Sequence, residues 1–129
     1  MLQRKIFLLI KFPLTVNMSN KNYGKEGETI AAEYLTRKGY TILEKNFRTS
    51  WGEIDIIAKH KDFLVIVEVK RRCSANFGEP FEAVDLRKQN RLKKIALYYL
   101  SKIGREYPLR FDVIAIKGKE IKHIENAFC

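Results

Sequence analysis

The sequence has few of the residues that cross-link small domains through disulfides or metals. It contains two cysteines, Cys73 and Cys129, and two histidines, His60 and His123, in 129 residues. No Cys-x-x-Cys pair or Cys/His cluster occurs, whereas a structural zinc site needs four ligands at short spacings. We therefore expect free thiols in a reducing cytoplasm and two surface histidines on turns or strand ends.

Long apolar runs are also absent. No run approaches the ~18 residues of a membrane span, so we expect no membrane association. The apolar N-terminal stretch is interrupted by Lys11 and Pro13 and precedes no small-residue cleavage site, which argues against a signal peptide. Because patterned sequence begins only after Met18, residues 1–17 are expected to be a loosely attached strand or tail, or an extension upstream of the real start of translation. Residues 18–129 are expected to form one domain.

Acidic residues are scarce relative to basic ones. The chain has 15 Asp and Glu against 25 Lys and Arg, giving a net charge of +10. Three of the basic residues lie in residues 1–17, which leaves +7 on the rest. A polyanion is the leading partner, because Lys and Arg displace counterions from phosphates. Since no phosphate-binding glycine loop, nucleophile elbow or zinc-protease motif occurs, we expect no small-molecule cofactor.

Hydrophobic periodicity predicts an α/β fold. Helices are predicted over residues 24–38 and 85–101, and strands over 40–44, 54–58, 63–70, 109–116 and 120–124. The order α-β-β-β-α-β-β, without repeats or a linker, indicates a mixed central sheet flanked by helices. The run from Phe63 to Val67 is apolar without alternation, which is typical of a central strand covered on both faces.

Two carboxylates interrupt these apolar strands. Glu68 and Lys70 project from the same face of the third predicted strand, and Asp55 lies within the second. If residues 61 and 62 form a two-residue hairpin turn, Asp55 lies directly opposite Glu68, with Cβ atoms about 4.5–5.5 Å apart. Two carboxylates this close repel each other unless a cation lies between them.

Such a pair suits a hard divalent cation. Oxygen ligands from Asp55, Glu68 and the Val69 carbonyl fit Mg²⁺ or Mn²⁺, which polarises a phosphate oxygen and activates a bound water. Lys70 would orient that water or stabilise the charge that develops on the phosphate. The alternative is a simple cross-strand ion pair that joins Asp55 or Glu68 to Lys70 or Arg71.

Several separate motifs together resemble the YraN-like family, a group of small bacterial proteins of largely uncharacterised function. They are Gly24-x-x-Gly27-Glu28-x-x-Ala31-x-x-Tyr34-Leu35, Gly39-Tyr40, Asn46-Phe47-Arg48, Gly52-Glu53-Ile54-Asp55-Ile56-Ile57-Ala58, Val67-Glu68-Val69-Lys70-x-Arg72 and Arg110-Phe111-Asp112-Val113. The family in turn resembles the restriction-endonuclease-like superfamily, with its PD-(D/E)xK site, and the archaeal Holliday junction resolvases within it. This resemblance implies a restriction-endonuclease-like core and Mg²⁺-dependent cleavage of phosphodiester bonds in structured or branched DNA.

The matching motifs also imply individual roles. Asp55 and Glu68 stand at metal-ligand positions, Lys70 at the catalytic-lysine position, and Glu28 where resolvases have a helical glutamate that completes the site. An isoleucine replaces the usual proline before Asp55, which costs little because proline is not a ligand. Glu53 is either a further ligand or a loop anchor. Glu28 has an alternative role in complementing the helix dipole.

Basic residues flank the acidic cluster and are candidates for nucleic-acid binding. They are Arg48, Trp51, Arg71 and Arg72 near the cluster, and Arg87, Lys88, Arg91 and Lys94 on one face of the second helix. That helix face either follows a second phosphate backbone or is an ordinary solvated surface. No base-reading motif occurs, which favours recognition of DNA shape. Asp112 is interpreted as structural, paired with an arginine.

Two functions remain open from the sequence. The first is a metal-dependent endonuclease acting on branched DNA, as a homodimer if the substrate presents two symmetric strands. The second is a nucleic-acid-binding module that keeps the nuclease fold, has little intrinsic cleavage and acts with a partner. The complete Asp/Glu/Lys set favours the first, because a pure binder has no need of an acidic metal site within a basic surface.

Overall fold

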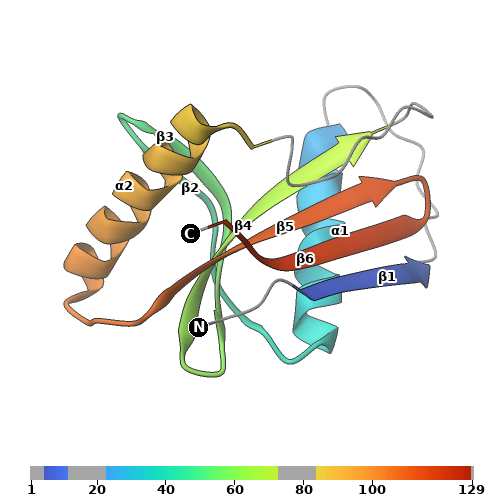
Figure 1. Ribbon diagram of the computed structural model, residues 1–129, viewed down its shortest axis with the longest axis horizontal. Helices are drawn as coiled ribbons and strands as arrows, with labels where there is room; N and C mark the ends of the chain where they lie inside the picture. The colour runs from blue at the N-terminus through green and yellow to red at the C-terminus, as the bar shows by residue number, and fades with distance from the viewer. Residues whose placement is uncertain (1–4, 12–22, 73–83, 129) are drawn as a thin grey trace.

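The computed structural model describes residues 5–11, 23–72 and 84–128 (Figure 1). Its elements are β1 (Lys5–Lys11), α1 (Tyr23–Arg37), β2 (Thr41–Thr49), β3 (Gly52–His60), β4 (Phe63–Arg72), α2 (Leu86–Ile103), β5 (Leu109–Lys117) and β6 (Glu120–Phe128). Cys73 and Cys129 lie outside the described residues. Within the described part of the chain, no helix combines the length and apolar character needed to span a bilayer.

All six strands form one mixed sheet in the order β1-β6-β5-β4-β3-β2. Among the described strands the β4–β5 pair alone is parallel, and α2 lies in the crossover that connects these two strands. The predicted α/β fold, with its order of helix, three strands, helix and two strands, is confirmed. The edge strand β1 adds to this order by pairing with β6. The expectation that residues 1–17 are a loosely attached strand or tail, or precede the real start of translation, stays a prediction.

Each face of the sheet is covered by one helix. Ile30 and Leu35 of α1 pack on one face in a cluster that includes Val65 and Val67. Ile95 of α2 packs on the other face, in a cluster that includes Leu64 and Ile66. Successive residues of β4 point to opposite faces of the sheet, and both faces are covered, which explains why its run is apolar throughout. The prediction of a central strand is confirmed.

Local signals fix both ends of α2. The Asp85 side chain accepts a hydrogen bond from the Lys88 backbone N–H at 2.9 Å, and so caps the first turn. At the other end Gly104, with φ 67°, donates its N–H to the carbonyls of Leu100 and Ser101. The N-terminal cap places Lys88 on the first turn of the helix, which faces the site described below.

The strands β3 and β4 separate from each other at one end of the sheet. Their ladder runs from His60 opposite Phe63 to Ile56 opposite Val67. Beyond this point β3 continues its pairing with β2, and β4 its pairing with β5. Figure 1 shows β3 bending toward α2 while β4 continues in another direction. We call the place where the strands part, at Asp55 and Glu68, the fork.

Candidate metal centre

Asp55 and Glu68 meet at the fork. The β3–β4 register keeps the predicted two-residue turn at residues 61 and 62, and one step beyond Ile56 and Val67 it brings Asp55 opposite Glu68. The Asp55 carboxyl group is hydrogen-bonded to Glu68, and its Oδ2 accepts the Val69 backbone N–H at 2.8 Å. The Asp55 side chain therefore connects β3 to β4 at the point where the backbones of the two strands separate. The predicted role of the Val69 carbonyl as a ligand stays a prediction.

Two further carboxylates lie at the same place. Ligand atoms of Glu28, Glu53 and Asp55 all lie within 4.8 Å of one another. Glu28 comes from α1, and the neighbouring Gly27 allows this helix to approach Arg71 of β4 closely. A Cβ at Gly27 would lie only 3.2 Å from the Cδ atom of Arg71. The helix thus adds an acidic side chain from outside the β3–β4 hairpin to those of Glu53, Asp55 and Glu68.

Ionisation of the carboxyl groups at the fork is unfavourable. Burial raises the pKa of Asp55 to about 8, and repulsion by Glu68 and a hydrogen bond to it add to the effect. The Val69 N–H acts in the opposite direction but is weaker. Burial and repulsion by Glu53 also raise the pKa of Glu28. In the absence of a cation, Asp55 therefore holds a proton at neutral pH.

Glu68 is the most enclosed acid of the cluster, and two lysines contact it. Its side chain is 4% exposed, and its Oε2 lies 3.4 Å from Lys70 Nζ and in an ion pair with Lys88 Nζ. Burial and the neighbouring Lys88 lower the pKa of Lys70. Burial acts to lower the pKa of Lys88 as well, but its hydrogen bond to Glu68 raises it. The ion pair that the sequence allowed as an alternative is therefore present within the same cluster.

The donor set fits a hard divalent cation. It consists of carboxylate oxygens, which Mg²⁺ and Mn²⁺ prefer. One of them, Glu28 Oε2, is buried without a hydrogen-bond partner among the described residues. A buried polar atom without a partner is costly, and a cation beside it would remove that cost.

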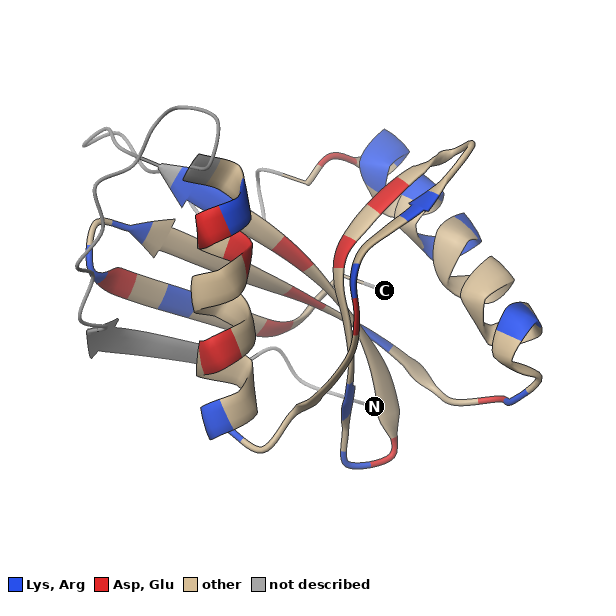
Figure 2. Cartoon of the chain, turned by 180° about the vertical axis from the view of Figure 1, so that it is seen from behind, with Lys and Arg blue, Asp and Glu red and all other residues tan. Residues whose placement is uncertain are grey.

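The basic residues predicted to bind nucleic acid surround the fork in different ways. Figure 2 shows acidic positions on β3 beside basic positions on β2 and α2. Arg48 is 74% exposed and bonds Glu53 at 3.0 Å, so Glu53 is anchored as well as close to Asp55. Arg71 lies 4.0 Å from Glu26 of α1. Arg72 belongs to β4, but its side chain lies outside the described ones.

The basic face of α2 packs against the β2–β3 turn. Lys94 Nζ lies 4.6 Å from the ring centre of Trp51, whose ring also meets Tyr98 edge-on. Arg91 covers Gly52, where a Cβ would come within 2.9 Å of the arginine Cδ. Arg87 is exposed. This helix face is therefore part of the rim of the fork, with Lys88 turned inward to Glu68.

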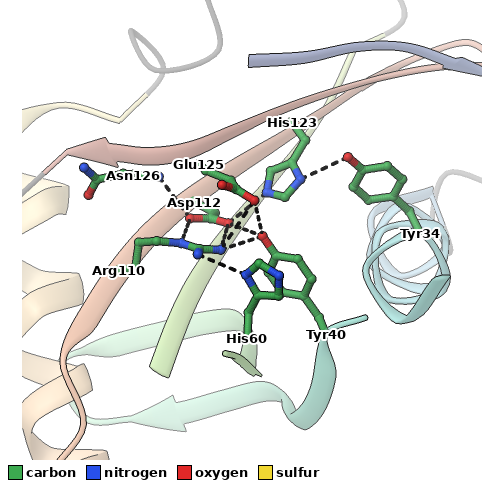
Figure 3. A network of polar contacts seen from close by, with 8 residues as sticks. All are labelled: Tyr34, Tyr40, His60, Arg110, Asp112, His123, Glu125 and Asn126. Atoms are coloured by element: carbon green, nitrogen blue, oxygen red, sulfur yellow. Dashed lines mark hydrogen bonds and ion pairs between the residues drawn. The ribbon is translucent and has the colours of Figure 1, made fainter. Parts of the chain in front are cut away.

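A second polar cluster lies in the core, on the α1 side of the sheet (Figure 3). Asp112 is fully buried and accepts hydrogen bonds from Arg110 Nε and Nη2 at 3.0 Å, so its predicted pairing with an arginine is confirmed. The prediction of surface histidines is wrong for His123, whereas His60 lies at a strand end, as predicted. His123 is fully buried, 2.8 Å from Asp112, and His60 is partly buried and stacked on Tyr40 at 4.0 Å.

Asp112, His123 and Glu125 also bring ligand atoms within 4.8 Å, close enough to hold a metal. However, the Arg110 guanidinium lies 3.0 Å from Asp112 and 3.8 Å from Glu125. Burial acts to raise the pKa of Asp112, but hydrogen bonds from His123 and Arg110 lower it. The charge of this cluster is thus already compensated, whereas at the fork burial and the neighbouring Glu68 raise the pKa of Asp55. The fork is the stronger candidate.

Fold and site define a small α/β protein with an acidic cluster at a strand fork and a basic rim. The model of the uncharacterised protein family UPF0102 matches residues 27–116, and the chain belongs to this family. It is 62% identical over 111 residues to a UPF0102 protein of Thermodesulfovibrio yellowstonii, covering 86% of this chain and 99% of that protein. A UPF0102 protein of Caldanaerobacter subterraneus is 47% identical over 119 residues, covering 86% and 98%. One from Clostridium botulinum is 49% identical over 117 residues, covering 84% and 95%.

Proposed function

We propose that this protein is a metal-dependent endonuclease that hydrolyses phosphodiester bonds in structured or branched DNA. The observation that carries the proposal is the contact between Asp55 and Glu68 at the fork, where Asp55 has its pKa raised to about 8 beside Lys70. The resemblance of the motifs to the PD-(D/E)xK nucleases and Holliday junction resolvases supports the same reaction. A basic rim around an acidic centre suits a substrate that is a polyanion.

Asp55, Glu68 and Glu28 are the residues that would hold the Mg²⁺ or Mn²⁺ ion. That ion would supply a Lewis acid for a phosphate oxygen and lower the pKa of a bound water. Asp55 loses its proton when the ion binds, because a carboxylate ligand must be ionised. Glu53 keeps Arg48 at the entrance to the site.

Lys70 is the group that would act on the reacting phosphate. It lies on the same strand face as Glu68, two residues further along β4, so its ammonium is held beside a residue that would bind the ion. From there it donates hydrogen bonds to the attacking water and to the phosphate oxygen on which negative charge grows. Its lowered pKa eases the release and return of a proton during this step.

Cleavage assays test the proposal. Labelled four-way junction, flap and linear duplex DNA are incubated with Mg²⁺, Mn²⁺ or EDTA. Asp55→Asn and Lys70→Met should reduce cleavage at least 100-fold, since the first removes a ligand of the ion and the second the ammonium that would act on the reacting phosphate. Matched controls are Glu33→Gln, an exposed acid of α1, and Lys119→Met, an exposed lysine of the β5–β6 turn, and both should cleave normally.

The outcomes separate the two functions. Cleavage that survives both site substitutions would show that the fork is not the active site. Metal-independent binding of DNA by every variant, without cleavage of any substrate, would instead establish a binding module that acts with a partner. The exposed Arg48 and Trp51 beside the fork would serve either function.

A further inference from the structure

Two ammonium groups contact one carboxylate oxygen at the fork. Both Lys70 Nζ and Lys88 Nζ pair with Glu68 Oε2. Lys70 belongs to the same strand as Glu68, so this contact follows from the alternation of the strand. Lys88 comes from α2, a different element that lies in the crossover between β4 and β5, and its presence here needs a separate explanation.

The position of Lys88 is built into the fold. Its backbone N–H is fixed by the Asp85 cap on the first turn of α2, and α2 packs through Ile95 on the same sheet face as Ile66, two residues before Glu68. The side chain is 28% exposed, whereas that of Glu68 is 4% exposed. The lysine therefore reaches inward from the rim and retains a path outward to solvent.

A divalent cation and the Lys88 ammonium compete for the same place. An ion bound to Glu68 would stand within a few ångströms of an ammonium that contacts the same oxygen, and like charges at such distances repel strongly in a partly buried site. Lys70 stands on the same strand face as Glu68, two residues away, whereas Lys88 reaches Glu68 from a separate helix at the rim. Lys88 is thus the group that can leave.

We propose that Lys88 is a tethered counter-ion that occupies Glu68 in the metal-free protein and is displaced outward when a divalent ion binds. The released ammonium then contacts a DNA phosphate beside the one held at the fork. The metal ion thereby both completes the reaction centre and frees a phosphate-binding group, which couples the two binding events. This inference rests on the proposed function, because it takes the fork to be the metal site.

Direct titration of Mn²⁺ into the metal-free protein, with free Mn²⁺ measured by electron paramagnetic resonance, tests the first half without any DNA. Lys88→Met keeps the length and apolar stem of the side chain but removes its charge, and should tighten Mn²⁺ binding about tenfold because the competing ammonium is gone. Lys88→Arg should stay close to the unsubstituted protein. Lys93→Met, on the same helix, is the matched control for the loss of one positive charge.

Unchanged or weaker Mn²⁺ binding by Lys88→Met, or no Mn²⁺ binding by either protein, would overturn the inference. Circular dichroism and thermal unfolding of each variant exclude a folding defect as the cause. Tighter Mn²⁺ binding by Lys88→Met, in a protein that cleaves no DNA, would keep the counter-ion role and reject only the proposed function.

The second half is tested by DNA affinity with a divalent ion and without it. With Ca²⁺, Lys88→Met should bind branched DNA several-fold more weakly than the unsubstituted protein, since one phosphate contact is lost. In EDTA the two proteins should bind equally, because Lys88 is then engaged with Glu68. An equal loss under both conditions would show that Lys88 contacts DNA regardless of the metal, and would overturn its release.

Discussion

Asp55 makes the metal-free protein sensitive to pH. Burial raises its folded-state pKa from the ordinary value of 3.8 to about 8, so the folded form holds this proton more tightly than the unfolded chain does. The resulting contribution to stability is complete below about pH 4 and is lost as the pH rises through 8. We predict that Asp55→Asn, which needs no proton, flattens the decline of the melting temperature between pH 5 and 9 in EDTA.

Thermal unfolding at several pH values checks this prediction, with Glu33→Gln as the control on the exposed side of α1. The proton on Asp55 also predicts how the stabilisation by a metal ion depends on pH. Because Asp55 must ionise to bind a cation, Mg²⁺ should stabilise the protein more at pH 8 than at pH 6. An unchanged pH slope in Asp55→Asn would mean that another group carries the effect.

Arg110 stabilises the core without taking part in the fork. Its guanidinium pairs with the fully buried Asp112, and removing one partner of a buried pair leaves an uncompensated charge. We predict that Arg110→Met lowers the free energy of unfolding in urea by about 3–5 kcal/mol. The Mn²⁺ affinity of the folded protein should stay unchanged, because Asp112 shares the α1 face of the sheet with Val67, whereas Glu68 points to the opposite face.

The control for this prediction is Asp62→Asn, an exposed residue of the β3–β4 turn, which should change stability little. Asp112→Asn gives the reciprocal comparison with Asp55→Asn. Loss of Mn²⁺ binding in Asp112→Asn and its retention in Asp55→Asn would move the metal site from the fork to the cluster of Asp112, His123 and Glu125.

At the scale of elements, the β2–β3 turn and α2 together form an aromatic and basic edge beside the fork. Trp51 is 40% exposed at this edge and is the single tryptophan of the sequence. Its ring is held between Lys94 and Tyr98. Because aromatic rings stack on unpaired bases, DNA with a branch point should quench its fluorescence more than continuous duplex does.

Trp51→Ala should weaken binding of branched DNA by about 1–3 kcal/mol, which is the usual worth of one stacked base. Trp51→Phe keeps an aromatic face and should retain most of the affinity, which separates stacking from packing against Tyr98. Fluorescence anisotropy of labelled DNA gives both values. Equal quenching by duplex and branched DNA would mean that this edge of the protein contacts only the DNA backbone.

Short-range patterns predicted the hairpin that builds the fork. A two-residue turn fixes the register of the strands on either side, and Lys61 accepts the required positive φ of 56°. The strand β2 was predicted to end at residue 44, because the following polar residues resemble a turn. It continues to Thr49 because its backbone pairs with β3, and pairing does not depend on apolar side chains.

No comparable short-range pattern in the sequence predicts the long-range contacts. The contacts of His123 with Asp112 and Tyr34 join β6, β5 and α1, which only the finished sheet order brings together. Lys88 was predicted to face DNA because helical periodicity defines a polar face but not the element that this face meets. The docking of α2 on the sheet turns that lysine toward Glu68.

At the scale of the whole molecule, the net charge of +10 predicts how DNA binding depends on salt. Each phosphate that a Lys or Arg neutralises releases counterions, so the logarithm of the affinity should fall linearly with the logarithm of the salt concentration, with a slope of about −0.9 for each contact on duplex DNA. The affinity of this protein should therefore fall steeply between low and physiological salt.

The rim of the fork should carry part of that slope. Arg48 is 74% exposed, and among the described residues it bonds Glu53 through Nε, which leaves its other N–H groups facing solvent for a phosphate. We predict that Arg48→Gln weakens DNA binding at every salt concentration and reduces the slope by about 1, whereas Lys119→Gln, on the distant β5–β6 turn, leaves it unchanged. Titrations of labelled DNA at four or more NaCl concentrations give the slopes. A flat salt response, or equal slopes for the two variants, would mean that DNA does not approach the fork across this rim.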